Sequence, residues 1–266
     1  MEMLQLNNLH KTFNPGTVNE KVALDGVSLQ MEAGDFATIV GSNGAGKSTL
    51  FGAIAGSFVV DEGTIRLDGQ NITNLPDYKR SKFIGRLFQD PLKGTAPNMT
   101  IEENLALAYL RASRKQSPFS MVTAKDRADF REKLAQLELG LEDRMDHPVG
   151  LLSGGQRQAL TLLMATLVTP KLLLLDEHTA ALDPATAEKV LNLTKKIVAE
   201  NHITCLMITH NIPSALSLGN RTIMMNGGRI VLELAGKERE TMTTEQLLKV
   251  FHQQGVSNDR ILFSAE

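Results

Sequence analysis

The sequence predicts an α/β fold that carries a helical insertion, and three stretches of the chain support this prediction. Residues 36–40 form a short apolar run, typical of a buried strand, that leads through a glycine-rich turn into a helical pattern at residues 50–54. Residues 172–175 are four successive leucines, which indicates burial on both faces and therefore a central strand of a parallel sheet. From about residue 92 to residue 168, helical patterns replace the strands.

The N-terminal part of the chain predicts short strands separated by a polar loop. Leucines stand between polar neighbours over residues 4–9, and further apolar groups follow at residues 22–24 and 27–29. The polar loop spans residues 14–21, and Phe13 lies at its start. Phe13 is either a core aromatic or a platform on which an adenine stacks, and taken alone the sequence favours neither.

The turn after the first buried strand fits the phosphate-binding pattern G-x-x-x-x-G-K-[S/T]. Its glycines allow successive backbone N–H groups to converge on one anion, and the following helix N-terminus adds further N–H groups and a positive dipole end. Lys47 is suited to reach the β- and γ-phosphates, and the Ser48 hydroxyl is suited to ligate Mg²⁺. A glycine-rich turn without a ligand is the alternative, and the correct flanking elements argue against it. The predicted nucleotide-binding residues are Gly41, Ser42, Asn43, Gly44, Ala45, Gly46, Lys47, Ser48 and Thr49.

Strands return after the first helix. Residues 64–67 predict one strand, which ends in a turn at Asp68-Gly69, and residues 83–88 predict another. Gln89 follows that second strand directly. A lone glutamine at a strand end normally has no function, so Gln89 is a candidate only in combination with other motifs.

The insertion predicts two helices. Thr100 as N-cap and Glu103 three residues later form a capping box, and a helix is expected from there to about Arg114. Pro118 marks a break, and a second helix is expected over residues 124–139.

A Leu-Ser-Gly-Gly-Gln run closes the insertion. Ser153, Gly154, Gly155 and Gln156 stand at the start of a helical stretch, where backbone N–H groups are exposed. In isolation, an ordinary glycine N-cap turn is the favoured interpretation. In a chain that also has a P-loop, a second phosphate-binding helix N-terminus is favoured instead.

The buried strand at residues 172–175 ends in two carboxylates, Asp176 and Glu177. Side chains at the carboxyl end of such a strand open into the crevice where α/β sheets bind ligands. Asp176 is suited to hold Mg²⁺ through water, and Glu177 is suited to polarise an attacking water. An acidic loop without function is the alternative.

The remaining elements follow in order. Asp183, followed by proline, predicts the N-cap of a helix. A strand at residues 204–209 ends at His210, which is either structural or placed to sense a γ-phosphate. Residues 222–232 predict a hairpin, and residues 243–251 a final amphipathic helix opened by a second capping box. The last dozen residues are expected to be weakly ordered.

Composition limits the function classes. The chain has 266 residues and a net charge of −2, so no global attraction to nucleic acid is expected, although a local basic patch stays open. Cys205 is the only cysteine, which excludes an internal disulfide and favours a buried thiol in a reducing compartment. The first residues lack signal-peptide features, and no apolar run approaches the ~20 residues of a spanning helix. A membrane role therefore requires a partner.

The order of the P-loop, Gln89, the Leu-Ser-Gly-Gly-Gln run, the Asp176-Glu177 pair and His210 resembles that of ATP-binding subunits of ABC transporters. The resemblance covers nearly the whole chain. It implies a P-loop NTPase fold, with a RecA-like α/β core, an antiparallel β subdomain and an inserted α-helical subdomain. The implied domains are an ATPase domain over residues 1–235, with its insertion at about 92–168, and a short C-terminal helical tail over residues 236–266.

The resemblance also implies roles for single residues. Phe13 takes the adenine-stacking position, which is often tyrosine in the family, and Gln89 links Mg²⁺ to the membrane partner. Asp183 belongs to the family's D-loop, and His210 is its switch histidine. Glu177 is the catalytic carboxylate.

Two copies are implied to enclose two ATP molecules. Each site would join the P-loop, Asp176, Glu177 and His210 of one copy to residues 153–156 of the other. Two helix N-termini would then face one triphosphate, so that ATP holds the two copies together.

The implied function is ATP-driven solute transport, with import favoured, through a separate permease at the cytoplasmic face of the membrane, together with an extracytoplasmic substrate-binding protein. Residues 90–99, beside Gln89, are the expected docking loop, with Leu92 and Met99 as apolar contacts. After Glu177 most of the family has proline where this chain has His178, for which a tolerated loop substitution is the favoured interpretation. The neighbouring sequence resembles a small bacterial branch of tryptophan/tyrosine-type uptake systems.

Two other protein classes compete with a transport ATPase as interpretations of the sequence. A non-transport ABC ATPase, such as an iron–sulfur assembly factor, is the alternative, because it too is a single domain without a membrane span. An ABC protein of nucleic acid or the ribosome is disfavoured, because such proteins usually have two ABC domains, a coiled coil or basic extensions. None of these is visible in the sequence.

Overall fold

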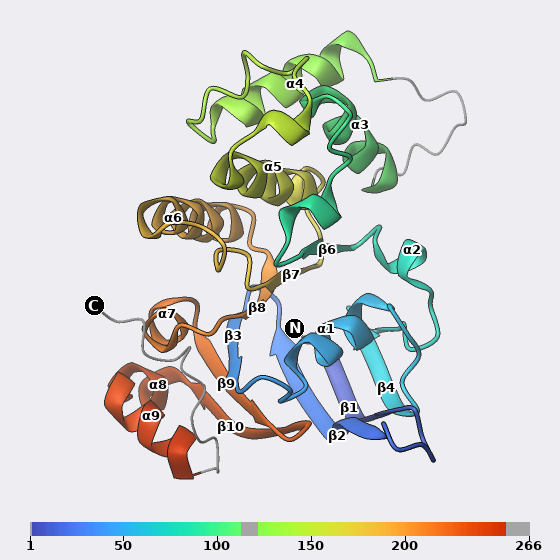
Figure 1. The fold of residues 1–266 in the computed structure, drawn as a ribbon, viewed down its shortest axis with the longest axis vertical. Helices are drawn as coiled ribbons and strands as arrows, with labels where there is room; N and C mark the ends of the chain where they lie inside the picture. The colour runs from blue at the N-terminus through green and yellow to red at the C-terminus, as the bar shows by residue number, and fades with distance from the viewer. Residues whose placement is uncertain (1, 113–121, 254–266) are drawn as a thin grey trace. The chain divides into compact units, whose positions relative to one another are not determined.

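The computed structural model describes residues 2–112 and 122–253, and these divide into two compact units. The first unit takes in the described residues up to Arg80 and those from His202 onward, and the second takes in Ser81–Asn201. Figure 1 shows the elements in chain order by colour. The expected helix end near Arg114, the break at Pro118 and the last dozen residues lie outside the described part of the chain.

An antiparallel sheet forms one part of the first unit, with the strand order β2-β1-β4-β5. The expected short strands at the N-terminus are instead two strands of 12 residues each. Register shifts interrupt their pairing, and Asn8 and Gly26 have positive φ angles at the irregularities. These bulges break the alternation of apolar residues, which is why the sequence predicted fragments. The strands are β1 (Glu2–Phe13), β2 (Lys21–Glu32), β4 (Glu62–Leu67) and β5 (Gln70–Asn71).

A second group of strands in this unit has the order β10-β9-β3-β8. Strand β3 pairs in parallel with both β8 and β9, while β10 runs antiparallel to β9, as the predicted hairpin requires. The carboxyl ends of β3, β8 and β9 therefore meet at one edge, from which helix α1 (Lys47–Ala55) follows β3. The strands are β3 (Phe36–Gly41), β8 (Thr204–Ile208), β9 (Arg221–Asn226) and β10 (Arg229–Ala235).

The C-terminal helices pack into the same unit. The predicted capping box is confirmed, because Thr243 N donates to Gln246 Oε1 at 2.8 Å and Gln246 N donates to Thr243 Oγ1 at 3.2 Å. Leu247 and Phe251 are fully buried in a cluster with residues of β9, β10 and α7. The remaining helices are α2 (Asp77–Arg80), α7 (Ile212–Ser217), α8 (Gly236–Thr241) and α9 (Thr244–Gln253).

The second unit contains the parallel strands β6 and β7 and the helices α3 to α6. The capping box at Thr100 and Glu103 is confirmed by both of its hydrogen bonds, at 2.7 and 3.1 Å. The helix expected over residues 124–139 ends early, because the chain turns with positive φ at Glu138 and Gly140. The elements are β6 (Ile84–Leu87), η1 (Pro91–Gly94), α3 (Ile101–Ala112), α4 (Ala124–Ala135), η2 (Val149–Leu151), α5 (Gly154–Thr166), β7 (Leu172–Asp176) and α6 (Pro184–Glu200).

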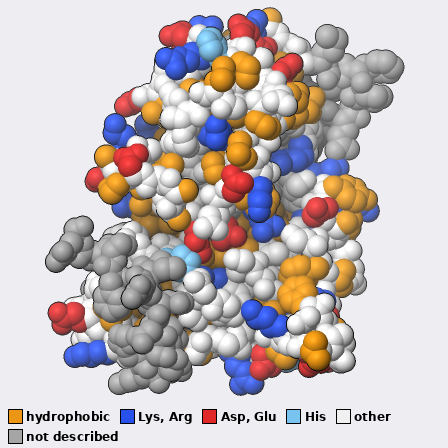
Figure 2. Space-filling view, in the orientation of Figure 1, with side chains coloured by type: hydrophobic (Ala, Val, Ile, Leu, Met, Phe, Trp, Pro, Cys, Tyr) orange, Lys and Arg blue, Asp and Glu red, His pale blue; other side chains and the backbone are white. Residues whose placement is uncertain are grey.

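The predicted helical insertion falls inside the second unit, and the predicted domain bounds stay predictions. Among the described residues, no helix is both long and apolar enough to pass through a bilayer. Acidic and basic side chains are interspersed over the face that Figure 2 shows.

Candidate functional site

The P-loop lies between β3 and α1 in the first unit. Gly46 is the N-cap of α1 with φ 101°, and no side chain of the described residues caps this helix. A Cβ atom at Gly46 would lie 2.5 Å from the Ala23 carbonyl oxygen, so only glycine fits there. The first N–H groups of α1 are therefore available to an anion, which is what a phosphate needs.

Lys47 lies beneath this turn. Its side chain is buried, and Nζ donates to the carbonyl oxygens of Gly41 at 2.7 Å and Ser42 at 2.9 Å. The ammonium group is thereby held inside the loop that would receive the phosphates. Ser48, in the first turn of α1, is exposed, so its hydroxyl is accessible to a metal ion. The other P-loop residues, Asn43, Gly44, Ala45 and Thr49, lie in the turn or in the first turn of α1.

The hairpin turn between β9 and β10 supports the P-loop from the side. Gly228 N donates to the Ala45 carbonyl oxygen at 3.0 Å, and the Gly228 carbonyl accepts from Asp25 N at 2.9 Å. A Cβ atom at Gly41 would lie 2.4 Å from the Met225 carbonyl oxygen. The sequence predicted this hairpin, but not its contact with the loop, because the partners are far apart in the chain.

Arg80 holds the other end of the P-loop helix. Its guanidinium is fully buried and donates to the carbonyl oxygens of Ala53 at 2.7 Å and Ile54 at 2.8 Å, at the C-terminus of α1. A further bond of 2.8 Å reaches the Thr73 carbonyl. Nothing in the local sequence pattern distinguishes Arg80 from an exposed arginine, so its role could not be predicted.

His210 follows β8 at the edge where the P-loop leaves β3. The two strands run in parallel, with Ile39 opposite Ile208, and Thr209 N donates to the Ile39 carbonyl at 3.1 Å. His210 is half-buried. Its location in the first unit is thus compatible with the predicted phosphate-sensing role.

Phe13 ends β1 and lies edge-to-face against Phe58, with ring centroids 5.3 Å apart and planes at 79°. The ammonium of Lys11 lies 5.6 Å from the Phe13 centroid and 5.7 Å from that of Phe58. Both rings are half-buried, so Phe13 packs against another aromatic and keeps part of its surface accessible. Its stacking against adenine stays a prediction. Phe58 was missed, and the aromatic shortly after the P-loop helix was its only signal.

In the second unit, Asp176 ends β7 and Glu177 follows in the left-handed region, with φ 46°. A non-glycine residue in this region is uncommon and is often found at functional positions. A turn bond of 3.0 Å from Ala180 N to the Glu177 carbonyl holds the peptide in place. The side chains of Asp176 and Glu177 are both half-buried.

His178 is fully buried behind this turn. Thr194 Oγ1 donates to the Val190 carbonyl at 2.8 Å, so its only proton is used and it must accept from His178 Nε2 at 3.1 Å. Nε2 therefore carries a proton, and burial lowers the pKa of His178 to about 4, which favours the neutral ring at neutral pH. The interpretation as a tolerated loop substitution stays a prediction, and the structure adds that the side chain ties the loop after Glu177 to helix α6.

Gln89 is exposed two residues after β6, at the start of a short turn of 3-10 helix. The Asp90 carboxylate caps that turn by accepting from Leu92 N at 2.9 Å. Further along the loop, the buried side chain of Asn104 in α3 forms two hydrogen bonds with the backbone of Ala96. Asn104 Oδ1 accepts from Ala96 N at 2.8 Å, and Asn104 Nδ2 donates to the Ala96 carbonyl at 3.0 Å, so the loop is held against the helix. The sequence predicted this loop, but not its 3-10 turn or its hydrogen bonds to Asn104.

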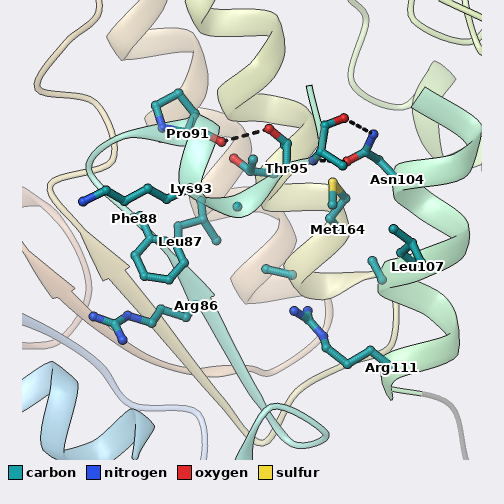
Figure 3. Close-up of a pocket in the computed structure, with 15 residues that line it drawn as sticks. Arg86, Leu87, Phe88, Pro91, Lys93, Thr95, Asn104, Leu107, Arg111 and Met164 are labelled. Atoms are coloured by element: carbon teal, nitrogen blue, oxygen red, sulfur yellow. Dashed lines mark hydrogen bonds between the residues drawn. The ribbon is translucent and has the colours of Figure 1, made fainter. Parts of the chain in front are cut away.

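A pocket of about 350 Å³ lies beside this loop, within the second unit (Figure 3). Residues of β6, η1, α3 and α5 line it, so the loop after Gln89 forms one of its walls. The predicted docking residue Leu92 is 44% exposed, whereas Met99 is half-buried.

Ser153 is the N-cap of α5, and it forms a reciprocal capping box with Gln156. Ser153 Oγ accepts from Gln156 N at 3.2 Å, and Gln156 Oε1 accepts from Ser153 N at 3.1 Å. The alternative of a glycine N-cap is therefore wrong. Gly154 and Gly155 form the first turn of the helix, where their N–H groups have no intrahelical acceptor.

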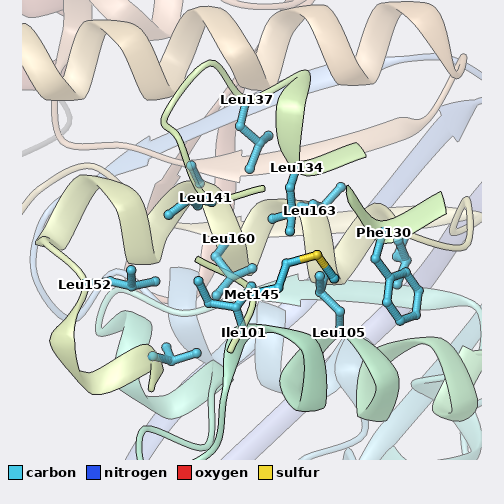
Figure 4. Packing of buried hydrophobic residues seen from close by; sticks show 13 residues of the cluster. Ile101, Leu105, Phe130, Leu134, Leu137, Leu141, Met145, Leu152, Leu160 and Leu163 are labelled. Atoms are coloured by element: carbon cyan, nitrogen blue, oxygen red, sulfur yellow. The ribbon is translucent and has the colours of Figure 1, made fainter. Parts of the chain in front are cut away.

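The packing behind this helix start fixes its position. Gly155 touches α6, where an added Cβ would lie 2.2 Å from Thr186 Cγ2. Arg157, which the sequence analysis did not assign, donates to the carbonyl oxygens of Leu152 at 2.9 Å and Gly150 at 3.1 Å. Beneath these groups lies the apolar core of α3, α4 and α5 (Figure 4), which includes Leu160.

Asp183 is the N-cap of α6, as predicted, and its Oδ1 accepts from Thr186 N at 3.0 Å. Hydrogen bonds from Thr186 hold the pKa of Asp183 below its usual value. Its predicted contact with nucleotide stays a prediction.

The predicted site residues thus fall into two groups. The first unit brings together the P-loop and His210 at one strand edge, with Phe13 at the end of β1. The second unit contains the remaining predicted residues, which are Gln89, Ser153, Gly154, Gly155, Gln156, Asp176, Glu177 and Asp183.

Comparisons with known proteins agree with this arrangement. Residues 24–180 match the family model described as ABC transporter. The chain is 45% identical over 249 residues to a tyrosine transport ATP-binding protein of Clostridioides difficile, covering 94% of this chain and 98% of that protein. It is 34% identical over 223 residues to a bicarbonate transport ATP-binding protein of Synechococcus elongatus, of whose length it spans 32%.

Solved structures are also similar. One is a dimeric ATP-binding cassette in a post-hydrolysis state with ADP and Pi, with a TM-score of 0.76, 32% identity, and coverage of 88% of this chain and 98% of that one. Another is a cassette in its ADP conformation, with a TM-score of 0.78, 28% identity, and coverage of 97% and 100%. This chain belongs to the ABC transporter family, as an ATP-binding and ATP-hydrolysing subunit.

Proposed function

We propose that this subunit powers the import of an aromatic amino acid of the tyrosine class. The observation that carries the ATPase part is the start of α1 at Gly46, whose N–H groups no side chain of the described residues caps. The substrate class is supported by the likeness to the tyrosine transport ATP-binding protein, which extends over 98% of that protein.

The residues present fit a nucleotide with a divalent cation. The P-loop supplies backbone donors and the Lys47 ammonium, and the Ser48 hydroxyl, the Gln89 amide oxygen and the Asp176 carboxylate are the hard oxygen ligands that Mg²⁺ prefers. Bound Mg²⁺ would neutralise charge on the phosphates. Glu177 would orient and polarise the attacking water, and His210 would contact the γ-phosphate.

Two copies of the chain are proposed to share each ATP. Ser153 and Gly154 are exposed at the start of α5, and the Ser153 hydroxyl can still donate while its oxygen accepts from Gln156. A second helix N-terminus would then add its positive dipole end to the same triphosphate. A similar cassette solved as a dimer with ADP and Pi supports this arrangement.

Transport requires a membrane partner, since no described helix can cross a bilayer. The permease is proposed to dock beside Gln89, where exposed Leu92 and the pocket of Figure 3 offer an apolar contact. The subunit would then lie on the cytoplasmic face of the membrane, with an extracytoplasmic binding protein delivering the substrate.

Reconstitution tests this function. The subunit and its permease in proteoliposomes should take up labelled tyrosine only with ATP, and ATP hydrolysis should rise when the loaded binding protein is added. Lys47→Ala should abolish both, while Lys171→Ala, a change outside the P-loop, should leave both intact. Hydrolysis that is indifferent to the whole set of aromatic amino acids would overturn the substrate class.

A further inference from the structure

His178 directly follows the candidate catalytic carboxylate Glu177, at a position where most of the family has proline. Proline restricts the backbone through its ring, whereas histidine leaves φ free. The His178 side chain is 2% exposed, so it lies in the interior of the second unit rather than at the surface of the loop. Any constraint that residue 178 places on this loop therefore comes from its side chain.

The imidazole is held by two hydrogen bonds in series that end inside helix α6. His178 Nε2 donates to Thr194 Oγ1 at 3.1 Å, and Thr194 Oγ1 donates to the Val190 carbonyl at 2.8 Å, one turn earlier in the helix. Thr194 is 1% exposed, so both bonds lie in the interior, where hydrogen bonds are stronger than in water. Nδ1 has no partner among the described residues, so the bond from Nε2 alone fixes the polar side of the ring there.

Glu177 has a backbone conformation that its surroundings must hold. Its φ of 46° is uncommon for a residue with a Cβ atom, and such a conformation persists only where neighbouring contacts enforce it. On one side, Leu175 of β7 pairs with Leu87 of β6. On the other side, Ala180 N donates to the Glu177 carbonyl at 3.0 Å, and the His178 side chain reaches α6. The peptide that carries the carboxylate is thus held between a strand and a helix.

Helix α6 is a fixed support for this bond. Asp183 caps its start by accepting from Thr186 N at 3.0 Å, and Thr186 lies tightly against Gly155 of α5. Thr194 follows His178 by 16 residues, so the bond bypasses the loop between them. A functional side chain keeps a precise position when a rigid element supports it through a second layer of hydrogen bonds.

We propose that His178 is a positioning residue for Glu177: its hydrogen bond to Thr194 on α6 fixes the peptide that presents the carboxylate to the attacking water. This inference rests on the proposed function, because it requires Glu177 to act on that water. The buried ring does not touch the reactants itself. It supplies through a side-chain bond the restraint that a proline would supply through its backbone.

Substitutions of Thr194 test the bond without changing the loop. Thr194→Val keeps the volume but removes the acceptor, so kcat for ATP hydrolysis by the full chain should fall about tenfold while KM for ATP stays unchanged. Thr194→Ser keeps the hydroxyl and should restore kcat. Thr166→Val is the matched control, because Thr166 Oγ1 donates a bond of the same kind to the Leu162 carbonyl in α5, at 2.8 Å. Unchanged kcat in Thr194→Val, or no rescue by Thr194→Ser, would overturn the proposal.

A double variant separates positioning from stability. Thr194→Val leaves a buried donor on His178 without its acceptor, which destabilises the fold. Adding His178→Leu removes that donor, so urea unfolding should show that most of the lost stability returns. Turnover should stay low in the double variant, because the link to α6 is still missing. If turnover returns together with stability, the bond serves the fold alone and the proposal is wrong.

Glu177→Gln distinguishes the possible failures. In that background Thr194→Val should cause no further loss of the residual turnover, since the group that the bond positions is gone. Tenfold losses in both backgrounds would show that the bond acts by another route and would overturn the proposal. Full activity of Thr194→Val beside an impaired Glu177→Gln refutes the positioning role alone. Normal turnover of Glu177→Gln itself refutes the proposed role of Glu177 and this inference together.

Discussion

His178 Nε2 donates a hydrogen bond of 3.1 Å to Thr194 Oγ1, and this bond joins the residue after Glu177 to the middle of helix α6. The imidazole is fully buried, and Nδ1 has no hydrogen-bond partner among the described residues. A neutral ring fits this environment and an imidazolium does not.

Stability should therefore fall as the pH drops. The ordinary pKa of 6.5 applies to the unfolded chain, and the folded pKa of His178 is about 4. Between these values the unfolded state binds more protons, so the free energy of unfolding decreases by about 2 kcal/mol from pH 6.5 to pH 5. Urea unfolding at several pH values measures this. In His178→Asn, which cannot titrate, that part of the pH slope should disappear; an unchanged slope would contradict the assignment.

Lys47→Ala should weaken ATP binding with the fold intact. The change removes a buried ammonium that is held inside the P-loop by Gly41 and Ser42. A charge-assisted contact of this kind corresponds to about a tenfold to hundredfold loss in affinity. Calorimetric titration with ATP measures the loss, and circular dichroism checks the fold. Unchanged affinity would exclude the role of Lys47.

Glu177→Gln should lower turnover while ATP binding survives. The amide keeps the shape of the side chain but cannot accept a proton from the attacking water, so turnover should fall by about 10²- to 10⁴-fold. The variant should accumulate as an ATP-bound dimer on gel filtration. Glu188→Gln, an exposed change on α6, serves as the matched control and should keep full activity. Near-normal turnover in Glu177→Gln would show that Glu177 is not the catalytic carboxylate.

Ser153→Arg should block ATP-dependent dimerisation without preventing ATP binding by the monomer. The arginine would occupy the space that the partner's γ-phosphate needs, at the exposed start of α5. It also removes the N-cap, which costs about 1 kcal/mol, so Ser153→Ala is the control that loses the cap alone. Light scattering with ATP should detect dimers for Ser153→Ala and only monomers for Ser153→Arg. If both dimerise, the shared site is wrong.

Leu92→Glu should weaken permease association about tenfold, because it places a charge on an apolar contact that is 44% exposed. Leu92 is a better test than Met99, which is half-buried and whose substitution would also disturb the loop. Val18→Glu, at a more exposed apolar position of the first unit, is the control. Co-purification from detergent and ATP affinity are measured together. If Leu92→Glu assembles normally with the permease, the docking surface does not include Leu92.

The sequence by itself determined the features whose signals are local. The P-loop, the capping boxes at Thr100 and Thr243, and the start of α6 at Asp183 all depend on residues within a few positions of one another. A backbone N–H at a helix start needs a nearby acceptor, and a serine, threonine or aspartate three residues away supplies it. Such patterns can be recognised in the sequence without knowledge of the tertiary contacts.

Only the tertiary structure decided the supports of these features. The Gly228 contact with Ala45, the Arg80 bonds to the end of α1 and the burial of His178 join residues that are far apart in the chain. The bulges in β1 and β2 likewise interrupt the apolar alternation, so the full length of these strands could not be predicted from the sequence. Burial and shape complementarity arise when separate elements pack, and neither has a local period in the sequence, so both stay invisible until the fold brings the residues together.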